Sequence, residues 1–169
     1  MLNHYRLCSL PNCVQMGYFD KHPKRTWALP WHQDMTIAVK DNSLPTDLFG
    51  KPTTKSGVPH VEGTNEVLQQ MLTLRIHLDD VTADNGPLKV IRGSHANGKL
   101  ADQTVSNQTH CVATIFAAAG DVLAMRPLIS HSSGASKPGT DRHRRILHLE
   151  FSGQPALPDG FEWYSFFAV

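Results

Sequence analysis

The sequence has few cysteines and no long hydrophobic run. Its three cysteines, Cys8, Cys13 and Cys111, are an odd number at spacings that match neither a disulfide framework nor a zinc ribbon. We therefore expect all three to be reduced and none to bind a metal. No stretch approaches the roughly 20 consecutive apolar residues of a membrane-spanning helix, and the N-terminus lacks the layout of a secretory signal. We expect a cytoplasmic protein that does not bind membranes.

An excess of charge of either sign is also lacking. Lys and Arg total 16 against 15 Asp and Glu, so the formal net charge is +1. This balance gives no broad attraction for nucleic acid and favours a small-molecule substrate as the partner. The 169 residues suffice for one hydrophobic core but not for two ordinary domains, so we expect a single domain over residues 1–169.

Helical periodicity is scarce, and only residues 64–70 predict a short helix. Short apolar runs bounded by turn residues dominate instead, several with the two-residue alternation of a half-buried strand. These runs lie at 35–39, 71–78, 88–91, 111–116, 121–125 and 145–151. The pattern indicates an antiparallel barrel or a double-sheet jelly roll. The one long irregular segment, rich in Pro and Gly, is 41–63, and its length predicts a lid over a binding site.

His32 and Asp34 form a candidate metal-binding pair. Residues two apart on an extended chain point the same way, so both side chains can ligate one ion. Two imidazoles and one carboxylate on one face of an octahedral ion leave three positions open, as in Fe(II) enzymes that bind both a co-substrate and dioxygen. The second histidine is predicted to be His131, at the end of a predicted strand. His95, in a Gly-Ser-His turn, is the alternative.

A basic cluster follows His131 and leads into the last predicted strand. It contains Arg142, Arg144 and Arg145. A dicarboxylate co-substrate needs a guanidinium to bind its far carboxylate with two hydrogen bonds. Alternation places Arg142 and Arg144 on one face of an extended chain and Arg145 on the other. A solvated basic turn explains two of the three arginines equally well.

Five segments together resemble the phytanoyl-CoA dioxygenase family over residues 18–151. They are WHQDMTIAV, MLTLRIHLDD, DNGPLKVIRGSH, GDVLAMRPLISHSS and RRILHLEF, in the order that the family has them. The resemblance implies an all-β fold whose core is a double-stranded β-helix, a cupin-like jelly roll, with few short helices. It also implies a shortened member that lacks part of the family's N-terminal region, for which dimerisation over an exposed flank is one compensation.

The resemblance also assigns residues to the site. It implies that His32, Asp34 and His131 hold Fe(II), and that Arg144 and Ser133 bind the distal carboxylate of the co-substrate 2-oxoglutarate. Arg145 stays the alternative to Arg144, because the two arginines are adjacent. His95 then has a structural role near the site.

The implied reaction is hydroxylation of a small molecule by dioxygen, with release of succinate and CO₂. The presence of Asp34 argues against halogenation, because related halogenating enzymes have a small residue at this position. Two alternatives stay open. One is a truncated, inactive metal-binding module. The other is a cupin-like isomerase or hydrolase that uses Zn or Mn and has no need of the arginine.

Overall fold

A computed structural model of the protein describes residues 12–101 and 111–166. Antiparallel strands are the main regular secondary structure of this part of the chain. The first sheet has the order β1-β11-β6-β9, with β1 at Cys13–Lys21, β11 at Arg144–Ser152, β6 at Met71–His77 and β9 at Val122–Met125. The second sheet has the order β2-β10-β7-β8, with β2 at Leu29–His32, β10 at His131–Ser133, β7 at Leu88–Ile91 and β8 at Val112–Ile115.

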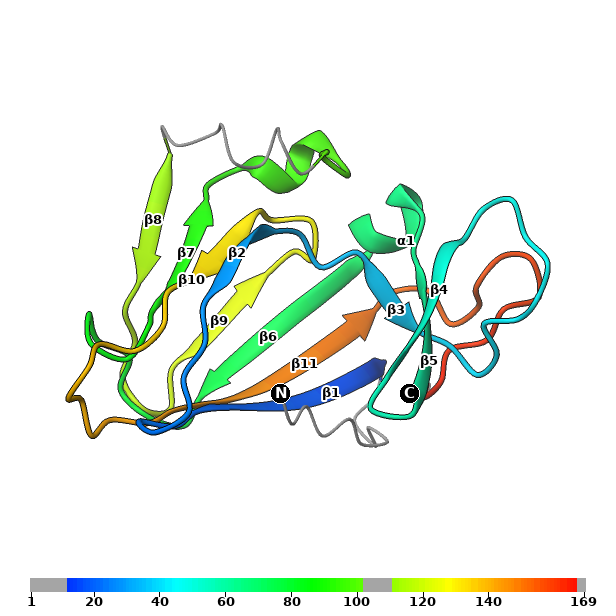
Figure 1. The fold of residues 1–169 in the computed structure, drawn as a ribbon. Helices are drawn as coiled ribbons and strands as arrows, with labels where there is room; N and C mark the ends of the chain where they lie inside the picture. Colours follow the sequence, from blue (N-terminus) through cyan, green and yellow to red (C-terminus); the bar gives the residue numbers. More distant parts are fainter. Residues whose placement is uncertain (1–11, 102–110, 167–169) are drawn as a thin grey trace.

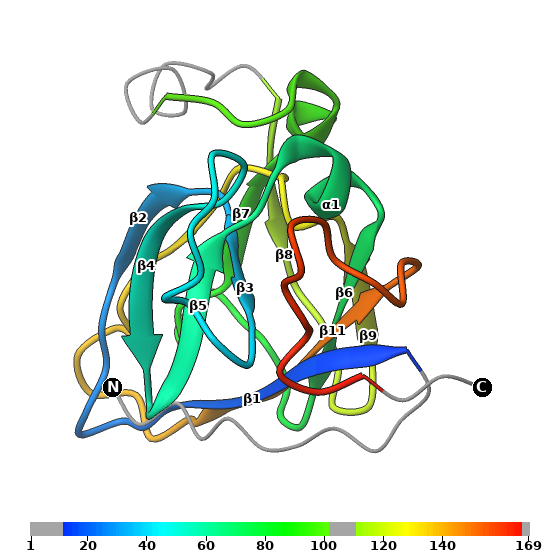
Figure 2. The same ribbon diagram turned by 90° about the vertical axis from the view of Figure 1, so that its right-hand side faces the viewer.

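A third, three-stranded sheet stands at one end of the other two. Its order is β3-β5-β4, with β3 at Thr36–Ala38, β5 at Val58–Glu62 and β4 at Gly50–Lys55. Figures 1 and 2 show the first two sheets facing each other, which is the arrangement of a jelly roll. The described helices are short: α1 covers Asn65–Gln69 and the 3₁₀ helix η1 covers Ser94–Asn97. The predicted cupin-like jelly roll with few short helices is confirmed.

The segment 41–63 differs from its prediction as an irregular loop. Residues 50–62 form the hairpin of β4 and β5, and β5 pairs with β3 from Thr36↔Glu62 to Ala38↔His60. The two residues between the strands, Ser56 and Gly57, have φ values of 49° and 83°. Positive φ at both positions is what a two-residue hairpin turn with the favoured twist requires. Its many Pro and Gly residues suggested a loop, but the pairing of β5 with both β3 and β4 makes residues 50–62 strands. The role of the segment as a lid stays a prediction.

The apolar core is divided between the two ends of the molecule. The larger cluster, which includes Ile37, Leu68 and Trp163, lies around the third sheet, and a smaller one around Leu88, Val90 and Met125 joins the first two sheets. Between these clusters the inner faces of the first two sheets carry buried polar side chains instead. Because a buried unpaired polar group is unfavourable, polar residues in the middle of a barrel indicate a binding site.

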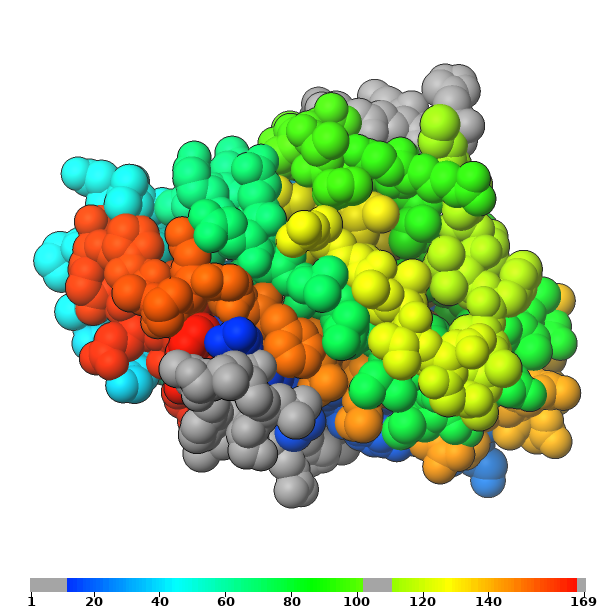
Figure 3. Space-filling view, turned by 180° about the vertical axis from the view of Figure 1, so that it is seen from behind, coloured from blue at the N-terminus to red at the C-terminus, as the bar shows by residue number. Residues whose placement is uncertain are grey.

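The outer face of the first sheet, which is the side seen in Figure 3, carries a few exposed apolar side chains. Leu72, Leu78 and Val122 are 37%, 41% and 53% exposed there. Dimerisation over such a face stays a prediction.

Cys111 is free and exposed, but Cys13 is disulfide-bonded, so the expectation of three reduced cysteines is wrong for Cys13. None of the helices in the described ranges is long and apolar enough to cross a membrane.

Candidate active site

The structure brings His32, Asp34 and His131 together. His32 ends β2 and His131 begins β10, and the two are directly paired across these strands. Asp34 follows β2, where its backbone N–H donates to the Pro127 carbonyl at 3.0 Å. Its carboxylate oxygens lie 3.8 Å from His32 Nε2 and 3.5 Å from His131 Nε2. One ligand atom from each of the three residues lies within 4.8 Å of the others, close enough to share one metal ion.

Backbone carbonyls set the orientation of both imidazoles. His32 Nδ1 lies 2.7 Å from the Pro30 carbonyl oxygen, and His131 Nδ1 lies 2.9 Å from that of Ile129. A carbonyl oxygen can only accept, so each Nδ1 carries the proton and each Nε2 keeps a lone pair. Both lone pairs face the Asp34 carboxylate. This donor set, two neutral imidazoles and one carboxylate, suits Fe(II).

Burial and charge keep His131 and Asp34 in the protonation states that a metal requires. Burial lowers the pKa of His131 to about 4, although Asp34 acts in the opposite direction. Burial alone would raise the pKa of Asp34, but the charges of His131, His148, His32 and Arg75 together lower it below its usual value. At neutral pH the site therefore offers a neutral His131 and an ionised Asp34.

The three residues open onto one cavity of about 380 Å³ between the sheets. Ser133 and Arg144 line this cavity too, as do Lys51, Lys55 and Glu62 from the segment predicted as a lid. The side chains of His32 and Asp34 are 33% and 28% exposed, so their ligand atoms are accessible to molecules that enter. His131 is only 3% exposed at its side chain and forms the inner wall.

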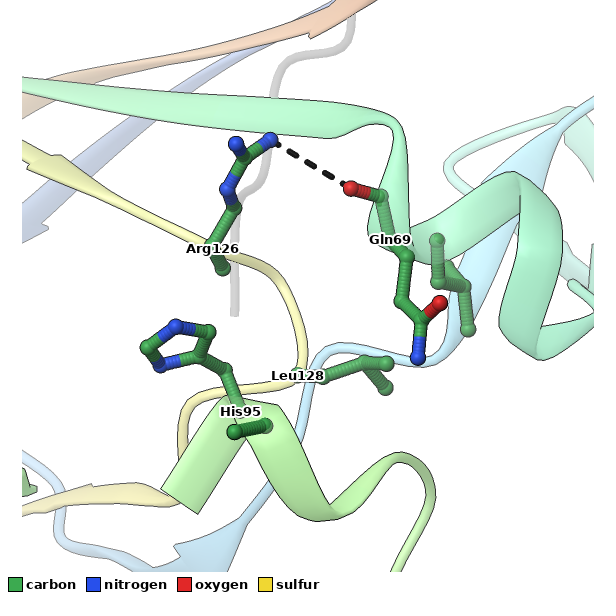
Figure 4. Close-up of a pocket in the computed structure, with 6 residues that line it drawn as sticks. Gln69, His95, Arg126 and Leu128 are labelled. Atoms are coloured by element: carbon green, nitrogen blue, oxygen red, sulfur yellow. Dashed lines mark hydrogen bonds between the residues drawn. The ribbon is translucent and has the colours of Figure 1, made fainter. Parts of the chain in front are cut away.

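His95 lies elsewhere. It lines a separate pocket of about 260 Å³ with Gln69, Arg126 and Leu128 (Figure 4). Arg126 there donates to the backbone carbonyls of Gln69 and Met71. His95 is not among the residues that line the cavity of His32, Asp34 and His131. The geometry therefore favours His131 over His95 as the second histidine.

Arg144 and Arg145 are separated by the alternation of β11. Arg145 is exposed, and its Nε donates to Asp79 Oδ2 at 2.9 Å on the outer surface. Arg144 is 3% exposed and lines the cavity, and its Nε and Nη1 have no hydrogen-bond partner. A buried guanidinium with unpaired N–H groups is unfavourable unless an anion enters beside it. The third candidate, Arg142, is exposed in the loop before β11.

Lys21 lies directly behind this end of the cavity, against two of its lining residues, and the sequence patterns did not indicate it. It is fully buried at the end of β1, directly opposite Arg144. Its Nζ donates to Ser133 Oγ at 2.9 Å and to the Gly134 carbonyl at 2.6 Å. Because Ser133 Oγ accepts from Lys21, its own hydroxyl proton is available to a ligand. Lys21, Ser133 and Arg144 together, here called the anion end, form a basic pocket.

The Lys21 ammonium has a pKa lowered to about 7, first by burial and then by the charges of Arg144 and Arg75. The remaining groups that face it are Ser133, the Gly134 carbonyl and the Trp27 ring, none of them acidic. An anion bound here favours the protonated form. Above pH 7 the free protein must therefore take up a proton to bind the anion, and affinity falls.

We expect the dissociation constant for 2-oxoglutarate to rise roughly tenfold between pH 6.5 and pH 8.5. The measurement is calorimetric titration of the Fe(II)-loaded protein at each pH. Lys21→Met should bind more weakly at pH 6.5 and show a flat profile. Lys24→Met, which removes an exposed lysine on the same segment, should keep the wild-type profile. A pH-independent wild type would contradict a role for the Lys21 charge.

Comparison with known proteins agrees with the architecture. The sequence profile of "Phytanoyl-CoA dioxygenase (PhyH)" matches residues 4–145. The chain belongs to the phytanoyl-CoA dioxygenase family. The family resemblance predicted from the five sequence segments is confirmed. No curated protein gave a match.

Solved structures share the fold of this phytanoyl-CoA dioxygenase family member. EvdMO1 has a TM-score of 0.59 at 24% identity, over 88% of this chain and 28% of its own. AviO1 from Streptomyces viridochromogenes Tue57 has a TM-score of 0.56 at 24% identity, and the match covers 86% of this chain and 52% of AviO1. EctD from S. alaskensis with bound Fe has a TM-score of 0.56 at 18% identity, and the match covers 83% of this chain and 44% of EctD. The chain thus spans about half or less of the length of these relatives.

Proposed function

We propose that the protein is an Fe(II)- and 2-oxoglutarate-dependent dioxygenase that hydroxylates a small molecule. One observation supports this most strongly: a metal-ligand triad and a buried guanidinium with unpaired N–H groups open onto the same cavity. A triad alone is compatible with Zn or Mn and non-oxidative chemistry. The anion end has no role in such an enzyme, whereas 2-oxoglutarate needs both a metal for its 2-oxo acid and a cation for its far carboxylate. Family membership supports the proposal, as does the similarity of the fold to solved structures such as the "non-heme alpha ketoglutarate dependent carbocyclase SnoK".

Each residue has a distinct part in this proposal. His32, Asp34 and His131 would hold the iron through two Nε2 atoms and a carboxylate, and Arg144 with Ser133 and Lys21 would bind the distal carboxylate. Bound Fe(II) would supply the coupling of 2-oxoglutarate decarboxylation by dioxygen to oxidation of a substrate carbon. The protein orients both ligands and, since His131 and Arg144 are buried, keeps water away from one side of the site.

The test is anaerobic titration of the metal-free protein with Fe(II) and then 2-oxoglutarate. We expect the weak visible metal-to-ligand charge-transfer band of the chelate, followed by oxygen-dependent formation of succinate. Succinate, which lacks the 2-oxo group, serves as the control ligand and should give no band. A folded protein that shows no band with both ligands present would contradict the proposal and favour an inactive module or a different metal.

A further inference from the structure

A second polar group lies in the same cavity, on the inner face of the first sheet. Alternation along β11 turns His148 and Glu150 inward with Arg144, and Arg75 of β6 lies directly opposite His148. All four residues line the cavity. Arg75, His148 and Glu150 are 7%, 5% and 5% exposed. Neither the metal triad nor the anion end accounts for these three residues.

Arg75, His148 and Glu150 form a relay of hydrogen bonds whose direction is fixed. Arg75 Nη1 donates to His148 Nδ1 at 3.2 Å, because a guanidinium can only donate. His148 therefore carries its ring proton on Nε2, which donates to Glu150 Oε1 at 3.1 Å. The other carboxylate oxygen, Glu150 Oε2, is buried and receives no hydrogen bond from the residues that the structure describes. The relay thus ends in one hydrogen-bond acceptor that the protein leaves unpaired.

The position of this acceptor separates it from the co-substrate. Glu150 is six residues from Arg144 on the same strand, which corresponds to about 20 Å at the usual rise of a β-strand. Arg75 and His148, in contrast, are close enough to Asp34 for their charges to lower its pKa. The relay therefore begins beside the metal ligands and leads away from the anion end. A ligand that contacts Glu150 is the molecule to be oxidised, not 2-oxoglutarate.

We infer that Glu150 Oε2 binds an O–H or N–H group of the substrate, so that the enzyme acts on a small hydroxyl- or amine-bearing molecule rather than on a bare acyl chain. This inference rests on the proposed function. Arg75 holds His148, and His148 holds Glu150, so both are positioning residues. A buried site built to accept a hydrogen bond discriminates strongly against an analogue that lacks the donor, because its own polar atom is then left unpaired.

The first measurement uses matched probes. Oxygen-dependent succinate formation by the Fe(II)-loaded protein is followed with methyl glycosides, polyols and amino alcohols. Each is compared with the analogue in which one hydroxyl or amino group is replaced by hydrogen, and with short fatty acids. We expect at least one hydroxyl- or amine-bearing compound to stimulate succinate formation tenfold or more over its analogue. If no such compound exceeds its analogue, or if the fatty acids stimulate equally, the inference is overturned.

The second measurement uses Glu150→Gln. Glutamine keeps an oxygen that can accept from His148 but replaces the unpaired oxygen with an N–H donor. The variant should therefore keep the charge-transfer band with 2-oxoglutarate. It should lose the tenfold preference for the hydroxyl- or amine-bearing probe over its analogue. A purely structural role predicts that all probes are affected equally. Glu162→Gln, at an exposed salt bridge with Lys40, should discriminate like the wild type.

The two proposals fail in different ways. Absence of the charge-transfer band in the wild type contradicts the proposed function itself. A normal band together with unchanged discrimination in Glu150→Gln overturns only the assignment of Glu150. The band therefore serves as the internal control for every variant of the relay.

Discussion

Replacing Asp34 with alanine is expected to abolish 2-oxoglutarate turnover and to weaken iron binding. The carboxylate is the one anionic ligand of the triad and lies within 4 Å of both imidazole Nε2 atoms. Its loss leaves two neutral ligands for a divalent ion, so we expect a decrease in succinate formation on the order of 1,000-fold. Iron binding is measured by equilibrium dialysis or calorimetry, and turnover by succinate analysis.

The fold of this variant should survive, because Asp34 is a partly exposed residue that lines a cavity and not part of an apolar cluster. A thermal melt of the metal-free variant near the wild-type value checks this. Asp47→Ala, at an exposed position outside the cavity, is the matched control and should turn over normally. Full activity of Asp34→Ala would refute its assignment as a ligand.

The grouping of two of the three candidate metal ligands could be predicted because its signal is local. A His-x-Asp at the head of a strand fixes the relation of two ligands through the two-residue period alone. His131 required more, since only the pairing of β10 with β2 brings it opposite His32. The same two-residue period turns Arg144 inward and Arg145 outward, because β11 begins at Arg144. Residues tied to strand alternation were thus accessible from the sequence.

Residues whose role depends on sheet order were not accessible. Lys21 lies in the anion end because β1 pairs with β11, and Arg75 meets His148 because β6 pairs with the other edge of β11. Nothing in the spacing of these residues predicts that pairing. The sequence offered one indirect sign: Arg75 interrupts the apolar run at 71–78, and His148 and Glu150 interrupt the one at 145–151. A charged residue at an inward position of a buried strand is a reason to look for a site.

The hairpin at 50–62 was missed for a different reason. Pro and Gly were weighted as loop residues, but Pro52 lies on β4, an edge strand of its sheet, where the missing N–H costs little. Lys51 and Lys55 then reach the cavity from a strand and not from a loop. If this segment closes over the site, it does so as a paired hairpin, and the motion is that of a rigid element about its ends.

The arrangement of charge supports the proposed order of two ligands along the cavity. Two buried cations, Arg75 and Arg144, line it and a third, Lys21, lies directly behind it; burial lowers the pKa of each. Arg75 is partly compensated by Asp34 and by the relay to Glu150. Arg144 and Lys21 have no acidic partner among the described hydrogen bonds and salt bridges. The anion end is therefore the strongest site for a dicarboxylate, which leaves the Glu150 end for the substrate.

Replacing Arg144 with methionine is consequently expected to raise the KM for 2-oxoglutarate on the order of 100-fold. Methionine keeps much of the buried volume but removes the donors, so the co-substrate carboxylate loses its two-point contact. Iron binding should be unchanged, since the three ligands are intact. Removing a buried and unpaired charge should also leave the metal-free protein as stable as the wild type or more so. Steady-state kinetics, iron calorimetry and thermal melts provide these three values.

Two further variants separate the role of the guanidinium from that of charge alone. Arg144→Lys keeps one positive charge but not the bidentate geometry, and its KM should lie between those of the wild type and Arg144→Met. Arg145→Met removes the neighbouring arginine on the outer surface and should leave the KM unchanged, although it loses the salt bridge to Asp79. If Arg145→Met raised the KM and Arg144→Met did not, the arginine that binds the far carboxylate would be Arg145 and not Arg144. If neither variant raised the KM, a different cation would bind the far carboxylate. Metal-dependent activity that needs no 2-oxoglutarate at all would instead favour a cupin-like enzyme.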